Sequence, residues 1–283
     1  MILFEDRAAS VLYNVLVNIP QKKFILPLNV CPIVPDTFKK ANKEFVFVDI
    51  ALDTLCIDFD KALKVMKDDE KVDGILFVKT FGISFDVQPF YKKIKKLNEN
   101  IFIIDDMCPS MQEFDYDIEN SHADMALFSS GYSKYVDIGY GGYGFVKEDD
   151  FKHIFKDKQN QKPFLEYRQK LEDNIPLMQK HKKELNEIYS SYIESKYHLG
   201  SQWNNWRFSI LVDDKEKILK EIFKIDGLFA SSHYPQIDFS YVDNPQQNTN
   251  TFKIHSKIVN LFNDSRYDIE KAEKTAQIVR KFL

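Results

Sequence analysis

The sequence predicts an α/β protein in which a mostly parallel sheet is sandwiched by helices, followed by a smaller C-terminal α+β domain. Short runs of consecutive apolar residues alternate with charged, helical stretches from Phe4 to about Val146. Strands with such runs are buried on both faces, as in parallel sheets. A long stretch rich in Lys, Glu, Gln and Asn then precedes a closing part with strand and helix patterns. We place the two domains at residues 1–165 and 166–283.

Six apolar runs are the expected strands of the first domain. They lie at residues 24–26, 45–48, 74–78, 101–104, 125–128 and 144–146. The stretches 59–67 and 87–97 are the expected covering helices. Ligands of parallel sheets bind at the carboxyl ends of the strands, so polar side chains that directly follow these runs are candidates for a site.

The region after residue 147 differs in composition from the first. Residues 147–195 are polar and charged, with apolar residues at loosely helical spacing, and predict long connecting helices. The elements expected after them are a strand at 206–212, a helix at 216–223 that ends before Gly227, and a closing helix at 269–282.

Composition excludes several classes of function. The net charge of -4 provides no basic face for nucleic acid and no polybasic membrane anchor. Cys31, Cys56 and Cys108 are too scattered for a disulfide framework or a zinc site, which favours a reducing, cytoplasmic location and no metal. The start of the chain turns acidic after three apolar residues, unlike a signal peptide or a membrane span.

Two charged side chains near the ends of apolar runs give the main indication of function. The run 101–104 ends in Asp105 and Asp106, and Lys134 follows the run 125–128. A carboxylate and an amine in such places are what pyridoxal 5'-phosphate chemistry requires, one for the pyridine nitrogen and one for a Schiff base. Only Asp106 fits the inward alternation of the strand, so we assign the carboxylate role to Asp106.

Several blocks of the sequence occur in the order typical of one family. They lie at residues 25–34, 46–50, 81–86, 104–106 and 128–142, and more weakly at 206–212, 231–235 and 258–261. This order resembles the fold-type I pyridoxal phosphate enzymes of the DegT/DnrJ/EryC1/StrS nucleotide-sugar aminotransferase family. The chain looks like a divergent and shortened member, and the resemblance implies the large-domain fold of these enzymes.

The resemblance implies roles for three residues at the strand ends. Lys134 matches the lysine that holds the cofactor covalently and moves the proton between substrate carbon and cofactor. Asp106 matches the aspartate that keeps the pyridine nitrogen protonated. Ser129, five positions before Lys134, matches a serine that binds the cofactor phosphate. We expect burial and the cationic cofactor to favour the neutral form of Lys134.

Four further positions complete the expected cofactor site. Arg7 and Ala8 fall where the family has a short turn that opens a helix, whose free N–H groups bind the phosphate. Cys31 stands where many members have an aromatic ring that stacks on the cofactor. Cys108 is expected to line the pocket.

The sequence departs from the family pattern in four places. Cys31 cannot stack, Pro109 replaces a frequent His or Gln, and Asp6 replaces the glycine of the phosphate turn. The segment with which members reach into the neighbouring subunit's site is not recognisable between Lys147 and Lys180. These departures leave open a relative without catalysis that serves as a binding or assembly partner, or an enzyme on another small amino compound.

The leading interpretation is a pyridoxal phosphate-dependent aminotransferase. The resemblance implies a nucleotide-linked keto sugar as substrate, glutamate as amino donor, and a homodimer. No nucleic acid, membrane or metal is expected as a partner.

Overall fold

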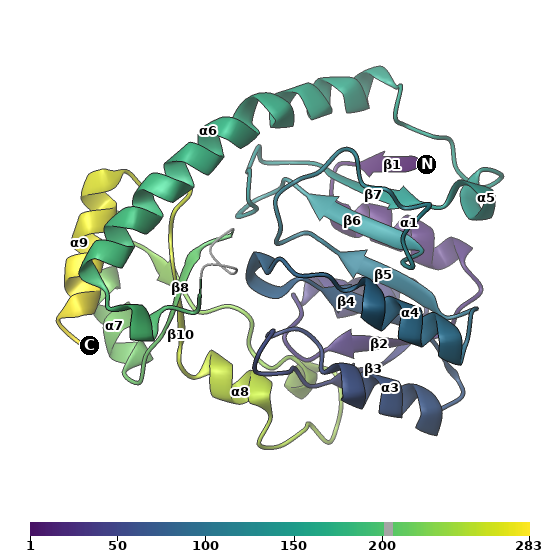
Figure 1. Cartoon of the computed structure of the whole chain (residues 1–283), viewed down its shortest axis with the longest axis horizontal. Helices are drawn as coiled ribbons and strands as arrows, with labels where there is room; N and C mark the ends of the chain where they lie inside the picture. Colours follow the sequence, from purple (N-terminus) through teal and green to yellow (C-terminus); the bar gives the residue numbers. More distant parts are fainter. Residues whose placement is uncertain (201–205) are drawn as a thin grey trace.

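A seven-stranded sheet forms the centre of the N-terminal domain of the computed structural model, which describes residues 1–200 and 206–283 (Figure 1). Its strands are β1 Ile2–Glu5, β2 Lys23–Pro27, β3 Glu44–Val48, β4 Val72–Val78, β5 Phe102–Asp106, β6 Met125–Ser129 and β7 Gly142–Val146. The strand order is β1-β7-β6-β5-β4-β2-β3. β7 runs antiparallel to β1 and β6, and the remaining pairs are parallel.

All six expected strands are present, and the sequence missed the seventh. β1 is a short edge strand whose residues Ile2 and Leu3 are buried against the core. It pairs with β7, more than 130 positions away in the chain, for example Ile2 with Phe145. A run of three apolar residues followed by acids gives no period by which such a strand could be recognised.

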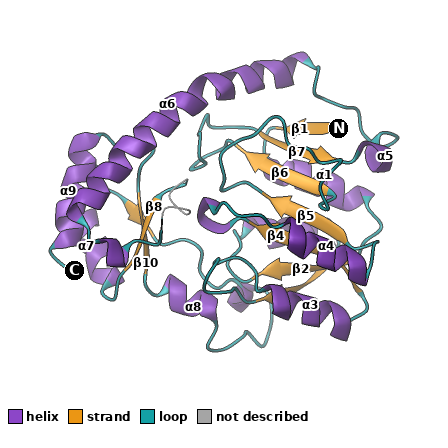
Figure 2. Ribbon diagram, in the orientation of Figure 1, coloured by secondary structure: helices purple, strands orange, loops and turns teal. Residues whose placement is uncertain are grey.

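Two layers of helices cover the faces of this sheet (Figure 2). The helices α1 Ala8–Asn18 and α2 Ile33–Lys40 pack on one face, and α3 Phe59–Asp68 and α4 Gln88–Leu97 on the other. Successive strand residues alternate between the layers, since Ile103 packs with α3 and α4 whereas Ile104 packs with α1 and α2. The alternation places Asp105 and Asp106 on opposite faces of β5.

A single helix connects the two parts of the molecule. After α5 Glu148–Phe151, α6 runs from Lys162 to Tyr192 and contains Pro176. Its start packs on the large core through Tyr167, and its end packs on the C-terminal core through Tyr189. The expected long connecting segment is thus mainly one helix of 31 residues. The expected domain boundary at 165/166 falls within its first turns.

The C-terminal part is a small antiparallel sheet covered by helices. Its strands have the order β8 Phe208–Leu211, β10 Ile258–Leu261, β9 Ala230–Ser231. The helix α9 Ile269–Arg280 lies beside the end of α6 (Figure 1), and α7 Lys215–Phe223 lies beside α9. The short helix α8 spans Asn250–His255. The expected strand and both expected helices are confirmed to within two residues at each end.

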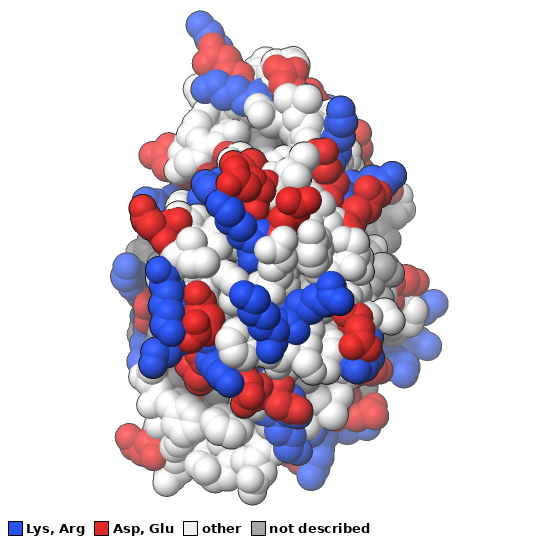
Figure 3. All heavy atoms as spheres, turned by 90° about the vertical axis from the view of Figure 1, so that its left-hand side faces the viewer, with Lys and Arg blue, Asp and Glu red and all other residues white. Residues whose placement is uncertain are grey.

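The surface of this part carries charges of both signs. Figure 3 shows Lys and Arg side chains interspersed with Asp and Glu over the face that α6, α7 and α9 build. Among the described residues, no helix combines the length and the apolar character needed to cross a bilayer.

Asp49, directly after β3, joins the C-terminal part to the edge of the large sheet. Its Oδ2 accepts from the Asn250 N–H at 2.8 Å, and its Oδ1 accepts from the Thr251 N–H and hydroxyl at 3.0 and 2.9 Å. Burial acts to raise the pKa of Asp49, but these donors outweigh it and hold the pKa below its ordinary value. The carboxylate therefore stabilises the docking of α8 onto β3.

Candidate active site

A cavity of 460 Å³ opens at the carboxyl ends of β5 and β6, on the side of the sheet covered by α1 and α2. All seven positions that the sequence analysis selected line it: Arg7, Ala8, Cys31, Asp106, Cys108, Ser129 and Lys134. They come from five separate segments of the chain. The structure therefore brings the whole predicted set together, and what the set binds stays a prediction.

The turn before α1 forms one end of the cavity. The Gly141 N–H donates to the Asp6 carbonyl at 2.7 Å, which holds the turn against the start of β7. A Cβ atom at Gly142 would lie 2.1 Å from the Ala8 nitrogen, so this close approach requires glycine. Arg7 is the N-cap of α1 and supplies no side-chain cap, and Ala8 and Ala9 line the cavity. The free N–H groups of a helix start attract anions.

Asp106 ends β5 and is 5% exposed. The Cys108 N–H donates to its Oδ1 at 2.9 Å, which fixes the carboxyl group at the strand end. Burial raises the pKa of Asp106, and the bond from Cys108 and the charge of Lys134 counteract this only in part.

Asp105 lies on the other face of β5 and does not line the cavity. The Tyr116 hydroxyl donates to its Oδ2 at 3.3 Å. Burial raises the pKa of Asp105 to about 6. Asp106 therefore lines the cavity and Asp105 does not, as the alternation of side chains along β5 predicts, and the cofactor role of Asp106 stays a prediction.

Lys134 lies in the loop between β6 and β7. Burial acts to lower its pKa, as we expected, but the interactions with Cys108, Tyr234 and Asp106 together raise the pKa above the ordinary value. The protein residues alone therefore do not favour the neutral amine, and the expected combined effect of burial and the cationic cofactor stays a prediction. A further positive charge near the amine would be needed to favour its neutral form.

Ser129 ends β6 and is held by a residue that the sequence analysis did not select. The Gln112 side chain donates from Nε2 to the Ser129 carbonyl at 2.7 Å and to the Val136 carbonyl at 3.2 Å. It thereby ties the end of β6 to the residues just after Lys134. Gly139 and Gly141 belong to the turn between β6 and β7, and both line the cavity.

Two cysteines and two tyrosines share the cavity. Burial raises the pKa of the Cys108 thiol well above its ordinary value, so this side chain is a neutral lining group. Cys31 lines the same cavity and offers no ring. Tyr132 and Tyr140 also line it and supply the aromatic rings of its lining.

The comparisons with known proteins give structural matches only. No protein-family model matches the chain, and no curated protein matches it by sequence. Helicobacter pylori PseC, an aminotransferase of pseudoaminic acid biosynthesis, matches with a TM-score of 0.78 and 17% identity over 99% of this chain and 86% of PseC. DesI, solved with its TDP-sugar product, matches with a TM-score of 0.81 and 14% identity over 99% and 80%. The sugar aminotransferase CalS13 from Micromonospora echinospora matches with 0.77 and 11% over 100% and 87%.

The chain has the fold of these proteins. The predicted fold class, with the large domain of fold-type I enzymes and a smaller C-terminal α+β part, is confirmed.

The C-terminal part places aromatic side chains beside the loop that carries Lys134. The rings of Trp206 and Tyr234 stack with centroids 5.9 Å apart, and Phe81 packs on Tyr234 at 5.4 Å. Tyr234 lies within electrostatic reach of Lys134, and burial raises its pKa to about 12. Burial likewise lowers the pKa of His233 to about 4. Trp206, His233 and Tyr234 lie in the weak family blocks and were given no role from the sequence, where their aromatic content was the only signal.

Proposed function

We propose that the protein is a pyridoxal phosphate-dependent aminotransferase that acts on a nucleotide-linked keto sugar, with glutamate as the amino donor. The observation that supports this is one cavity lined by a lysine, a buried carboxyl group and a helix start. PseC, DesI and CalS13, whose fold the chain shares, are described as aminotransferases or as bound to a sugar product. The named substrate and donor rest on the family resemblance.

The residues of the cavity fit the cofactor at each of its three polar ends. The start of α1 and the Ser129 hydroxyl suit a phosphate, the Asp106 carboxyl suits a protonated pyridine nitrogen, and the Lys134 amine suits an aldehyde. The backbone at Gly142 lies so close to Ala8 that only glycine fits there, and this contact places Ala8 at the phosphate end of the cavity. The volume of 460 Å³ lies within the range of about 300 to 1,000 Å³ typical of ligand sites.

Each residue of the cavity would have its own role in amino transfer. When bound, the cofactor supplies an electron sink for the carbanion that forms next to the amino group. Asp106 would hold a proton on the pyridine nitrogen, and Ser129 with the start of α1 would orient the phosphate. Lys134 would bind the cofactor aldehyde and then, as the free amine, take a proton from the substrate carbon and return it.

A homodimer and a cytoplasmic location belong to the same proposal. Tyr132 and Ile33 line the cavity and are 75% and 48% exposed, which leaves apolar surface at its rim that a second copy would cover. The cysteines Cys31, Cys56 and Cys108 are unpaired, which suits a reducing compartment.

A relative without catalysis is the second candidate. Cys31 supports it, because this residue lines the cavity in the place expected for a stacking ring. The acidic Asp6 also lines the phosphate end, where its charge opposes an anion.

The test uses the purified full chain with added pyridoxal phosphate. We expect a visible absorbance band that borohydride bleaches, and a covalent adduct on Lys134 by mass spectrometry. Glutamate should convert the band and release 2-oxoglutarate, and a TDP-linked keto sugar should restore it. Absence of any adduct on Lys134 would support the second candidate. An adduct that responds to other amino compounds but not to keto sugars would keep the enzyme class and reject the substrate.

A further inference from the structure

Ser133, the residue before Lys134, has an unusual backbone conformation. Its φ is 62°, in the left-handed region that residues with a side chain adopt rarely. Such a conformation persists only where surrounding contacts hold it, and these cases cluster at functional sites. Because Ser133 is bonded directly to Lys134, its conformation sets the direction in which the lysine side chain leaves the loop.

Every polar group of Ser133 has a partner. Its N–H donates to the Asp137 Oδ2 at 2.8 Å within the same loop. Its carbonyl accepts from the Trp206 Nε1 at 2.6 Å. Its hydroxyl oxygen accepts from the Arg207 Nη2 at 3.2 Å and the Arg266 Nη2 at 3.4 Å. Three of the four bonds therefore come from the C-terminal part, and we call Trp206, Arg207 and Arg266 the Ser133 clamp.

The arginine at the centre of the clamp is itself rigidly held. Arg207 is 2% exposed, and its guanidinium lies over the Trp206 ring at 4.6 Å and the Phe262 ring at 3.8 Å. Its Nη1 donates to the Ser231 hydroxyl. Within residues 1–200 and 206–283, Arg207 has no carboxylate within 4.0 Å, and the pKa of Arg207 is lowered by burial to about 10. Asp264 offsets only part of this effect of burial. A buried guanidinium without a direct ion pair is costly, so its hydrogen bond to Ser133 matters more than an exposed contact would.

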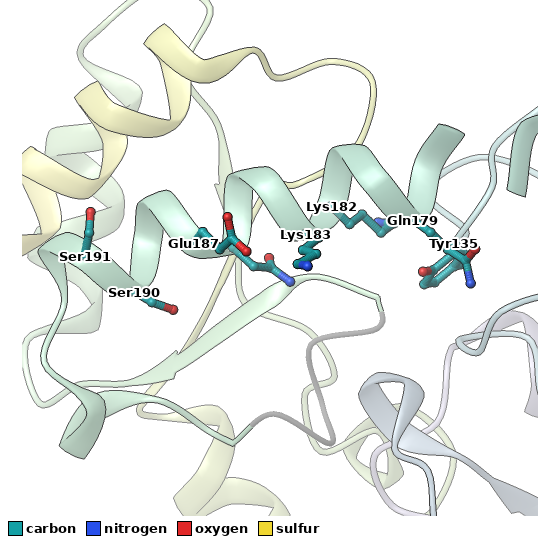
Figure 4. A pocket seen from close by; sticks show the side chains of 8 residues that line it. Tyr135, Gln179, Lys182, Lys183, Glu187, Ser190 and Ser191 are labelled. Atoms are coloured by element: carbon teal, nitrogen blue, oxygen red, sulfur yellow. The ribbon is translucent and has the colours of Figure 1, made fainter. Parts of the chain in front are cut away.

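Lys182 of α6 holds the two segments of the clamp together. Its Nζ donates to the Trp206 carbonyl at 2.8 Å and to the Asn263 Oδ1 at 2.9 Å. Figure 4 shows the side chain extending from α6 toward Tyr135, the residue after Lys134, and its Nζ lies 5.0 Å from the centre of that ring. Arg266 is fixed separately by its ion pair with Asp264. The connecting helix thus contacts both the clamp and the lysine loop.

We propose that Trp206, Arg207 and Arg266 are positioning residues that direct Lys134 into the cavity by holding Ser133 in its left-handed conformation. The proposal rests on the proposed function in one respect, namely that Lys134 is the amine that binds the cofactor. Under this proposal, the reactivity of Lys134 in the large domain depends on how the C-terminal part packs against that domain.

The first experiment removes one donor of the clamp and keeps its ring. Trp206→Phe deletes the Nε1–H that bonds Ser133. Tyr197→Phe is the matched control, because it deletes one hydroxyl that donates to a backbone carbonyl, that of Leu283 at 2.9 Å, in the same part of the chain. With pyridoxal phosphate as the probe, we expect the rate of adduct formation on Lys134 to fall roughly 2- to 10-fold in Trp206→Phe and to stay unchanged in the control. Equal rates in the two variants would overturn the proposal.

The second experiment removes the need for the clamp. Glycine adopts a positive φ without steric cost, so Ser133→Gly should lessen the dependence of Lys134 on Trp206. In the Ser133→Gly background, Trp206→Phe should slow adduct formation less than it does in the wild-type background. An equal or larger loss in that background would mean that Trp206 acts in another way, and would overturn the proposal.

A third measurement separates this proposal from the proposed function. Reductive methylation with formaldehyde and cyanoborohydride, followed by mass spectrometry across a pH series, reports the reactivity of Lys134 without any cofactor. We expect Trp206→Phe to shift the pH profile of Lys134 and to leave that of Lys162, whose side chain is 87% exposed, unchanged. A shift without any pyridoxal phosphate adduct in the wild type would reject the proposed function and keep the positioning role. An unchanged profile would reject the positioning role.

Discussion

The loop that carries Lys134 has the cavity at one end and the contacts with the C-terminal part at the other, and these two ends are built in different ways. At the large-domain end, Asp106 and Ser129 are the last residues of two buried strands, and backbone hydrogen bonding fixes where they lie. At the other end, the Trp206 side chain of the C-terminal part donates to the Ser133 carbonyl, and Tyr234 lies close enough to Lys134 to affect its pKa. The position of the first end can be predicted from local sequence pattern, whereas that of the second depends on how the C-terminal part packs against the large domain. Lys134 lies between them and takes its direction from both.

The largest effect should come from Lys134 itself. Lys134→Ala removes the amine that faces the cavity, so the borohydride-stable adduct with pyridoxal phosphate should be lost completely in mass spectra. Lys147→Ala, at the far end of β7 from the cavity, is the control and should keep the adduct. An adduct of unchanged mass and yield on another lysine in Lys134→Ala would show that Lys134 is not the amine that binds the cofactor.

The next effect concerns the seating of the C-terminal part. Asp49→Ala leaves the donors of Asn250 and Thr251 without an acceptor, so we expect a loss of about 3 kcal/mol in the free energy of unfolding at pH 7. Because the folded-state pKa of Asp49 is lowered, the contribution is present above about pH 4 and is lost as the pH falls through the folded-state pKa. Urea unfolding at several pH values measures this.

The control for Asp49 is an exposed acid. Asp149→Ala removes a carboxylate whose side chain is 93% exposed, and unfolding should change little. If Asp49→Ala were equally mild at pH 7 and pH 3, the docking of α8 would not depend on this charge. If Asp49→Ala lowered the stability and left cofactor binding unchanged, the large-domain end would form independently of the docking of the C-terminal part.

The two adjacent aspartates should respond differently to the same change. Asp106→Asn removes the charge that suits a protonated pyridine nitrogen, so the affinity for pyridoxal phosphate should fall roughly 10- to 100-fold, as measured by equilibrium dialysis. Asp105→Asn should leave that affinity unchanged, because Asp105 lies on the opposite face of β5. Equal losses of affinity in the two variants would mean that the assignment of Asp106, and not Asp105, to the cavity face of β5 is wrong.

The pH dependence gives an independent measure of Asp105. Its folded-state pKa is raised to about 6, so the folded protein holds the proton more strongly than the unfolded chain. Stability should therefore fall as the pH rises from about 4 to about 6, and Asp105→Asn should reduce this fall. Thermal unfolding across that range tests it, and a profile identical to the wild type would indicate that Asp105 does not titrate in the core.

The contrast between the two ends also explains what the sequence could predict. Asp106 was distinguishable from Asp105 because side chains alternate along a strand, and Lys134 because it follows an apolar run. The contact of Trp206 with Ser133 joins residues 73 positions apart, and no local pattern encodes such a pair. The same is true of β1, which is recognisable as a strand only through its pairing with β7. Local patterns therefore predicted the fold and the large-domain end, and the long-range contacts required the structure.

The smallest expected effect concerns Cys31, which stands where the family resemblance implies a stacking ring. A ring stacked on the cofactor contributes roughly 0.5 to 1.5 kcal/mol beyond its buried area, or about tenfold in affinity at most. Cysteine cannot supply this, so the wild-type protein should lose cofactor measurably on dialysis. Cys31→Phe or Cys31→Trp should slow that loss if the ring fits the cavity, and Cys31→Ser should not.

The outcome for Cys31 also tests the alignment on which its role depends. Tyr132 and Tyr140 line the same cavity, and either ring could take the stacking place from another side. In that case the wild-type protein would retain stoichiometric cofactor through prolonged dialysis, and both large substitutions at Cys31 would loosen it by crowding the site. The segment 27–35 would then have to be shifted relative to the family, and Cys31 would be a lining residue of the same kind as Cys108. Tyr132→Leu and Tyr140→Leu would identify which ring contacts the cofactor, because only one of them should lower its affinity.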